Sequence, residues 1–263
     1  MYTLIKNIEK LNHILRLKKN NLILLFMFLS LSFSYAQEQD SVIKQPDNKK
    51  FKLFENSVDS LYREDQFYFG IMFDLLSKKP KGMRQSGFSG GMQLGYIRDM
   101  PINKRRNLAF GAGLGWAINS YGQNLFISED ENNKSVFLVL DKTLVDYSTN
   151  RLVTHQLEVP LQFRWRTSTP ENANFWRIYS GLRLGYIYYF KSKFKQSGNN
   201  VFQTDAKELN RFRYSLELSV GNSGFNFYFL YSLNPLFDSA YVKDTNEAIE
   251  IYPIKIGFVI YIL

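Results

Sequence analysis

Apolar and polar residues alternate with a period of two over most of the chain after residue 65. In QFYFGIMFDLL (66–76), Phe67, Phe69 and Ile71 fall on one face, and smaller or polar residues fall between them. This period is that of a β-strand, in which successive side chains point to opposite faces. The pattern recurs seven times and predicts eight strands, at residues 66–76, 86–99, 108–119, 151–167, 175–194, 211–221, 225–233 and 251–263.

The segment RLVTHQLEVPLQFRWRT (151–167) shows what kind of sheet this is. Leu157, Val159 and Leu161 alternate with charged or polar residues such as Glu158 and Arg164. A soluble strand fits this pattern, and so does a strand between lipid and a polar lumen. Each segment is long enough to cross a bilayer when tilted. The connections after residues 119, 194 and 233 are longer than those after 167 and 221, as in outer-membrane barrels. We therefore predict an all-β fold, an eight-stranded antiparallel transmembrane β-barrel.

Aromatic residues near the ends of the predicted strands give a second indication. Barrels in lipid carry aromatic girdles at both membrane interfaces. The alternative is a soluble sandwich with an aromatic core. The predicted girdle residues are Tyr96, Phe110, Trp165, Trp176 and Phe225 towards the periplasmic rim, and Trp116, Tyr186, Tyr188, Tyr231 and Tyr252 towards the outer rim.

The polar faces of the strands carry many charges. An eight-stranded barrel has an interior just wide enough to be filled by side chains. Buried charges need partners, so we expect Glu158 and Glu217 to pair with arginines. A register slip would turn Arg164 or Arg183 towards lipid, at about 2–4 kcal/mol each near the midplane. The network either fills the barrel structurally or forms a gate or ligand site. Its predicted members are Glu158, Arg164, Arg166, Arg177, Arg183, Arg213, Glu217 and Lys255.

Two local features carry separate predictions. Pro160 has no backbone N–H to donate to the ladder, so it predicts a local break or bulge in strand pairing. The long connection at about residues 120–153 contains an apolar run of its own, VFLVL at 136–140. We expect this connection to be a surface for contact with other proteins.

The N-terminus has the pattern of an export signal. Arg16, Lys18 and Lys19 precede an apolar run at 22–33, and the small residues that follow predict cleavage before Gln37. The run is short for a transmembrane helix, although an uncleaved anchor is the alternative. The predicted organisation is a signal peptide at 1–36, a periplasmic linker or arm at 37–65, and an outer-membrane barrel at 66–263. The expected location is the outer membrane of a Gram-negative bacterium.

Composition narrows the possible chemistry. The chain has 263 residues and no cysteine, which excludes disulfides and thiolate chemistry. The net charge is +9, and removing residues 1–36 takes away five basic residues and one acidic residue, which leaves +5. That charge does not indicate a nucleic-acid partner; we expect outer-membrane lipid as a partner instead. The mean hydropathy of −0.26 argues against a helical membrane protein but not against a barrel.

Candidate catalytic groups are sparse. The histidines are His13, inside the predicted signal, and His155, at the outer end of a strand. The run GAGLG (111–115) lacks the Lys-Ser/Thr of a phosphate loop. We predict no catalytic, cofactor or metal site and a protein that is not an enzyme. The alternatives are a lipid-modifying barrel enzyme that uses His155, or a small-ligand barrel that uses the arginine cluster.

Three segments resemble the PorT-like family of outer-membrane barrels in the Bacteroidetes. They are THQLEVPLQFRWRT, FWRIYSGLRLGYIYYFKSKF and LAFGAGLGWAINSYG, and the resemblance spans roughly residues 60–263. It implies a non-enzymatic barrel that supports type IX protein secretion, and gliding motility where that occurs, through contacts with other secretion-machine proteins. The resemblance carries over no catalytic residue.

Overall fold

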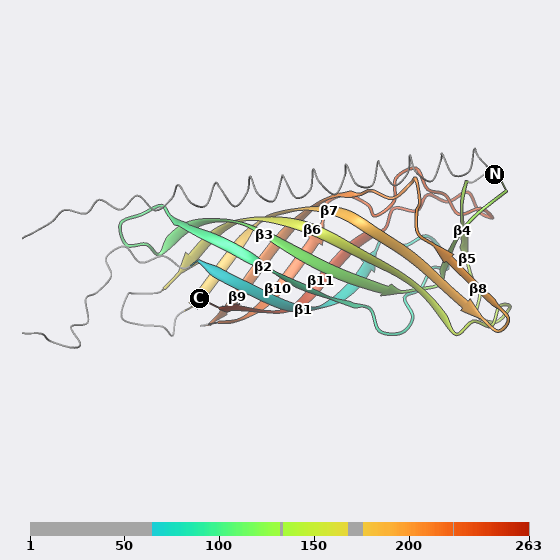
Figure 1. The fold of residues 1–263 in the computed structure, drawn as a ribbon, viewed down its shortest axis with the longest axis horizontal. Helices are drawn as coiled ribbons and strands as arrows, with labels where there is room; N and C mark the ends of the chain where they lie inside the picture. The colour runs from blue at the N-terminus through green and yellow to red at the C-terminus, as the bar shows by residue number, and fades with distance from the viewer. Residues whose placement is uncertain (1–64, 132–133, 168–175, 223, 263) are drawn as a thin grey trace, which may run out of the picture. The chain divides into compact units, whose positions relative to one another are not determined.

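The protein folds as a closed antiparallel β-barrel, which confirms the predicted fold class. The computed structural model describes residues 65–131, 134–167, 176–222 and 224–262, so the predicted signal and nearly all of the predicted arm lie outside it. Eight strands close in the order β1-β2-β3-β6-β7-β9-β10-β11, and β11 pairs with β1 (Figure 1). The barrel strands are β1 (Gln66–Ser77), β2 (Gly90–Pro101), β3 (Leu108–Gly122), β6 (Thr149–Arg166), β7 (Trp176–Gln196), β9 (Phe212–Asn222), β10 (Phe225–Ser232) and β11 (Tyr252–Ile262).

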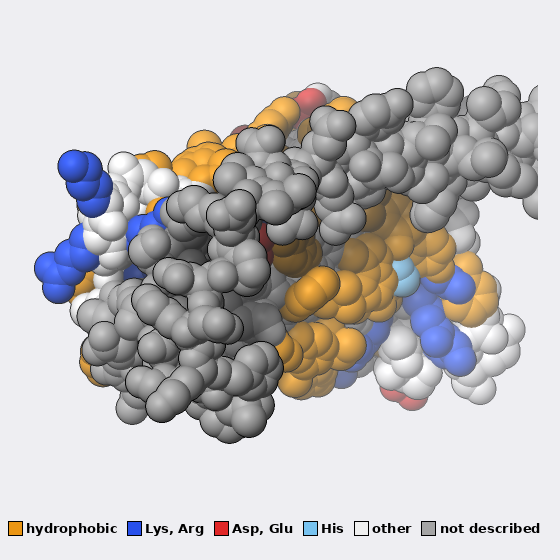
Figure 2. All heavy atoms as spheres, turned by 60° about the vertical axis from the view of Figure 1, so that its left-hand side comes forward, with side chains coloured by type: hydrophobic (Ala, Val, Ile, Leu, Met, Phe, Trp, Pro, Cys, Tyr) orange, Lys and Arg blue, Asp and Glu red, His pale blue; other side chains and the backbone are white. Residues whose placement is uncertain are grey.

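Alternation along the strands gives the barrel an apolar outside and a polar inside. On β1, Phe67 and Ile71 point outwards and are 62% and 58% exposed, whereas Gln66 and Asp74 are fully buried. Apolar side chains cover much of the visible barrel wall in Figure 2. Soluble monomers rarely expose an apolar surface of this extent, so lipid is the environment that fits it. Among the described residues, no helix has the length and apolar character needed to cross a membrane.

The connections between strands differ at the two ends of the barrel. Residues 78–89, 123–148, 197–211 and 233–251 join strands at one end, and the shorter connections 102–107, 167–175 and 223–224 join them at the other. Membrane barrels of bacteria place their longer loops outside the cell. We therefore call the end with the longer connections the external end.

The long connections pack together into a small layer with its own hydrophobic core, which we call the external cap. It contains the β4–β5 hairpin (Leu125–Glu129 and Ser135–Val139) and β8 (Asn199–Gln203), which pairs with β7. Phe137 of the hairpin bridges to Val242 and packs edge-on against Phe237, with 5.3 Å between ring centroids. Phe137 is 2% exposed, so this residue of the VFLVL run lies in the core of the cap and not on its surface. Loop–loop burial, which strand periodicity does not reveal, is the reason.

Two irregularities interrupt the ladders. The β3–β6 pairing skips the positions opposite Pro160 without a change of register, because proline has no N–H to donate; this confirms the predicted local break. A register shift in the β6–β7 pairing leaves Tyr188 as an extra residue, because His155 pairs with Tyr189 and Gln156 with Ile187. Such a bulge reverses the faces to which the following residues point.

Candidate functional site

The middle of the lumen is occupied by an ion-pair network centred on Arg183. Its guanidinium lies 2.6 Å from Glu158 Oε2 and 2.6 Å from Glu217 Oε2, and these side chains are at most 2% exposed. Tyr68 Oη accepts a further hydrogen bond of 3.1 Å from Arg183. The ammonium of Lys255 lies 3.7 Å from the other oxygen of Glu158. Two acids and two bases therefore balance one another across the barrel, as buried charges require.

A second cluster lies at the periplasmic end of the lumen and is built around Asp99. Arg166 donates to both oxygens of Asp99 at 2.9 and 2.8 Å, and Arg164 donates to one of them at 2.8 Å. Arg164 also donates to the side chain of Gln66 and lies 4.2 Å above the ring centroid of Tyr179. The bidentate geometry suits the planar guanidinium group, and the ion pairs link β2 to β6, which lie on either side of β3.

Arg213 connects the lumen to the external cap. Its guanidinium donates to the backbone oxygens of Pro235 and Asn234, the latter at 2.8 Å, so it holds the start of the 233–251 connection. The cavity beside Arg213 and Lys255 has a volume of about 10 Å³. That is room for roughly one water molecule. This part of the lumen is therefore filled, not open.

Glycines leave the space that these long side chains occupy. A Cβ added at Gly115 would overlap the hydroxyl of Tyr68, and one added at Gly111 would come within 2.8 Å of the Arg164 side chain. Neither glycine has an unusual backbone angle, so the lack of a side chain is what matters at these positions. The small residues of β3 therefore determine where the bulky polar groups of facing strands fit.

The structure brings all eight predicted lumen residues into the barrel interior, but not all into one network. The two glutamates pair with Arg183, whereas Arg164 and Arg166 pair with Asp99, which the sequence reasoning missed. Alternation along β2 and β1 could have identified Asp99 and Asp74 as inward-facing. The buried polar groups outside the predicted network include Gln66, Asp74, Gln93, Asp99 and Asn226, with the tyrosines Tyr68, Tyr179, Tyr228 and Tyr261.

The ten predicted girdle residues all lie on the outward face of the barrel, half-buried or exposed. Several pack at a tilt against aromatic neighbours of adjacent strands, such as Tyr96 against Phe67 and Tyr186 against Phe212, each with 5.1 Å between ring centroids. At the outer rim, the indole N–H of Trp116 donates to the Tyr188 hydroxyl at 2.8 Å. Ring pairs of this kind suit the interface between lipid and water.

His155 lies on the outward wall, within this aromatic group. Its ring is 4.8 Å from that of Tyr189, 5.6 Å from that of Trp116 and 6.1 Å from that of Tyr188, measured between centroids. No hydrogen bond from His155 to a serine or a carboxylate is found among the described residues. The described part of the chain also holds no group of three residues able to bind a metal. The position fits packing better than general-base chemistry.

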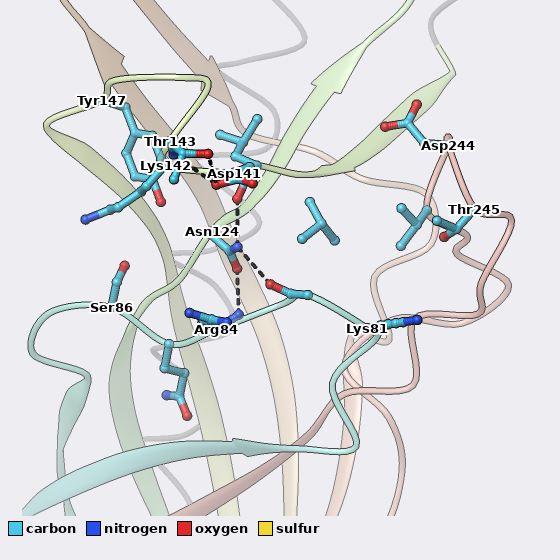
Figure 3. Close-up of a pocket in the computed structure, with 15 residues that line it drawn as sticks. Lys81, Arg84, Ser86, Asn124, Asp141, Lys142, Thr143, Tyr147, Asp244 and Thr245 are labelled. Atoms are coloured by element: carbon cyan, nitrogen blue, oxygen red, sulfur yellow. Dashed lines mark hydrogen bonds between the residues drawn. The ribbon is translucent and has the colours of Figure 1, made fainter.

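The external cap contains a recess of about 700 Å³ that the sequence did not predict (Figure 3). Asn124 holds its walls together: its side-chain oxygen accepts from the Arg84 N–H at 2.7 Å, and its amide donates to the backbone oxygens of Gly82 and Leu140. These bonds therefore tie the connection 78–89 to both ends of the β4–β5 hairpin at the recess. Its lining residues are Lys81, Gly82, Arg84, Gln85, Ser86, Asn124, Val139, Leu140, Asp141, Lys142, Thr143, Tyr147, Val242, Asp244 and Thr245.

The recess combines charges of both signs with hydroxyl groups. Asp141 accepts hydrogen bonds from the backbone N–H and the hydroxyl of Thr143, both at 2.9 Å, and these hold the pKa of the Asp141 carboxyl below its ordinary value. Burial raises the pKa of Tyr147, and the Lys142 ammonium lies 5.3 Å from its ring centroid. A cavity of this size and mixture can hold a polar peptide segment or a small polar molecule.

Comparison with known proteins identifies the family. The outer membrane protein beta-barrel domain matches residues 35–238, more than half of the chain. None of the curated proteins matches. Among solved structures, the chain is similar to Ail, the attachment invasion locus protein of Yersinia pestis, in complex with the heparin analogue sucrose octasulfate. The identity is 12%, the TM-score 0.32, and the alignment covers 76% of this chain and 99% of the Ail chain, a likeness that carries no argument. On the family match, this chain is an outer-membrane protein and belongs to the outer membrane protein beta-barrel domain family.

Proposed function

We propose that this barrel is a non-enzymatic protein that supports type IX protein secretion through contacts with other secretion-machine proteins. The observation that carries a supporting role is the filled lumen. Arg183 with its two glutamates, and Asp99 with its two arginines, occupy the middle and one end of the barrel. An eight-stranded barrel packed in this way has no room for a polypeptide cargo. Its contribution to secretion is then made at its surfaces.

The link to type IX secretion has its support in the sequence. The segments 154–167 and 175–194, which resemble the PorT-like family, form most of β6 and β7. They carry Glu158, Arg164 and Arg183, the residues around which the lumen network is built. The resemblance therefore includes the interior of the barrel as well as its apolar pattern. Gliding motility is the further role that this proposal implies where the organism glides.

The external cap is the surface proposed for partner contact. Its core fixes the connections 78–89, 123–148 and 233–251 against one another, so the recess between them is preformed. Preformed sites lose little conformational entropy when they bind. Basic and acidic side chains alternate around the recess, so it suits a segment of mixed charge from a partner protein; they are Lys81, Arg84, Asp141, Lys142 and Asp244.

The proposal is tested by deleting the gene and measuring the export of type IX cargo. Loss of cargo from the cell surface and medium, with the level of unrelated outer-membrane barrels unchanged, is the expected result. Complementation with Arg84→Glu tests the recess, and Lys104→Glu in the periplasmic turn 102–107 is a control with the same change of charge. Normal cargo export in the deletion strain would overturn the proposal.

An enzymatic role is tested in the same strain. His155→Phe keeps an aromatic ring against Trp116 and Tyr189 and removes both ring nitrogens. We expect full complementation, since the proposed role of His155 is packing. Loss of complementation by a variant that is present and folded in the outer membrane would favour a lipid-modifying enzyme instead.

A further inference from the structure

The longest strands of the barrel continue beyond its outer rim as a ribbon. β6 and β7 pair as far as Thr149 and Lys195, and β8 extends the ribbon by pairing with the end of β7. In Figure 1, β7 and β8 run together to the end of the molecule where β4 and β5 lie. One face of the ribbon packs on the external cap, because Leu152, Phe190 and Phe194 are buried there. The other face points outwards.

The bulge at Tyr188 determines which side chains the outer face carries. Before it, the outward residues of β7 have even numbers, as in Leu182 and Leu184; after it, they have odd numbers. Without the extra residue, Phe190 and Phe194 would point outwards and the lysines would point into the cap. With it, three lysines and the arginine opposite them lie on one outer surface, which we call the basic ribbon face: Arg151, Lys191, Lys193 and Lys195.

The basic ribbon face has no acidic partners among the described residues. Arg151 pairs directly with Lys193 across the ladder, an arrangement of like charges that is unfavourable by itself. Two acids of neighbouring segments are already engaged: Asp205 by Arg211, and Glu129 by Gln203. Arg151 is held in place by hydrogen bonds to Ser120 Oγ at 3.0 Å and to the Phe88 oxygen at 2.9 Å. A group of like charges without acidic partners in the described part of the chain favours an external anion.

The position of this face relative to the bilayer indicates which anion. The aromatic group around His155 borders this face: His155 is four residues from Arg151 on β6, and the girdle residue Tyr188 and its neighbour Tyr189 precede Lys191 on β7. Lys191 is two residues beyond Tyr189, which is about 7 Å along a strand. Girdle residues lie at the level of the lipid headgroups. In Figure 2, Lys and Arg side chains gather beside the histidine at the border of the apolar band.

We propose that the basic ribbon face binds the phosphate groups of phosphorylated glycolipid in the outer leaflet of the outer membrane. Guanidinium and ammonium groups are strong donors to phosphate oxygens, and Arg151 keeps N–H groups beyond the two that bind the protein. The glycolipid would lie with its acyl chains along the outward wall below the girdle. This inference depends on the barrel lying in the outer membrane and is independent of any role in secretion.

The test measures lipopolysaccharide binding by the full-length protein in neutral detergent, with tryptophan fluorescence as the readout because Trp116 borders the face. The variant Lys191→Gln/Lys193→Gln should bind about thirtyfold more weakly, because each lysine near an anionic lipid surface strengthens binding by roughly fivefold. Dephosphorylated lipopolysaccharide should bind the unchanged protein with a similar loss. The control, Lys104→Gln/Arg105→Gln, removes two charges from the periplasmic turn and should bind normally.

Four results would overturn the inference. The first is equal binding by the Lys191→Gln/Lys193→Gln variant and the unchanged protein. The second is an equal loss in the control variant, which would indicate a non-specific effect of net charge. The third is full competition by inorganic phosphate alone, which would make free phosphate the ligand. Lys191→Arg/Lys193→Arg keeps the charge and should bind normally; if it does not, charge is not the cause, and the inference fails.

Discussion

Replacing Arg183 by methionine tests the idea that the lumen is held by balanced charges. The guanidinium of Arg183 donates to Glu158 at 2.6 Å, to Glu217 at 2.8 Å through Nε, and to Tyr68 at 3.1 Å. Arg183→Met removes all of these bonds and one of the two positive charges that balance the two glutamates. The remaining positive charge belongs to Lys255, which is 3.7 Å from Glu158 and does not reach Glu217 at ion-pair distance.

The burial of these charges determines the expected loss in the free energy of unfolding. Breaking a buried pair by removing one partner costs about 3–5 kcal/mol, since the other charge stays buried without compensation. Glu217 keeps hydrogen bonds from Gln162 at 3.1 Å and from the Tyr228 hydroxyl at 2.8 Å, which offset part of this cost. The second variant, Arg183→Met/Glu217→Gln, restores charge balance between Glu158 and Lys255. It should therefore regain a large part of the lost stability.

The assay is urea unfolding of the barrel in lipid vesicles, followed by tryptophan fluorescence. Trp165 and Trp176 face outwards and are 38% and 57% exposed on the protein, so their emission reports transfer from lipid to water. The control is Arg211→Met, which breaks a surface pair with Asp205 and should change stability by less than about 1 kcal/mol. The reasoning is refuted if Arg183→Met unfolds at the same urea concentration as the unchanged protein, or if the double variant is no more stable than Arg183→Met.

Three further predictions concern the wall, the glycine packing and the cap. Gly115→Ala should destabilise the barrel by about 1–3 kcal/mol in the same urea assay, because its Cβ displaces the Tyr68 hydroxyl; Tyr68→Phe should restore part of this loss. Leu182→Arg places a charge in the lipid near the middle of the membrane and should lower the free energy of unfolding by about 2–4 kcal/mol, seen as a lower urea midpoint. An unchanged midpoint would contradict a lipid-facing wall. Thr143→Ala removes one of two hydrogen bonds to Asp141, so an NMR titration should show a rise in the Asp141 pKa. The stability that depends on ionised Asp141 would then be lost at a higher pH as the solution is acidified; an unchanged pKa would refute this.

Several features of the lumen could be assigned from the sequence, and others could not. The inward direction of Arg164 and Arg183 follows from strict alternation with large apolar residues along one strand. The partner of Arg164 does not follow, because Asp99 is 65 residues away and reaches it across β3 through the ladder registers. The same limit applies to Tyr68 and Gly115, which meet from β1 and β3.

The sequence by itself determined the eight strands of the barrel and the apolar face of each within the membrane; it did not show the short strands β4, β5 and β8 of the external cap. These properties depend on the period of two that backbone geometry imposes on every strand, and each segment of the chain shows it locally. Only the tertiary structure decided which charges pair, how the long connections bury Phe137 in the external cap, and where the recess beside Asn124 forms. It also decided, through one extra residue at Tyr188, that Lys191 and Lys193 point outwards. These outcomes depend on contacts and registers between segments that are distant in the chain, and no local pattern specifies them.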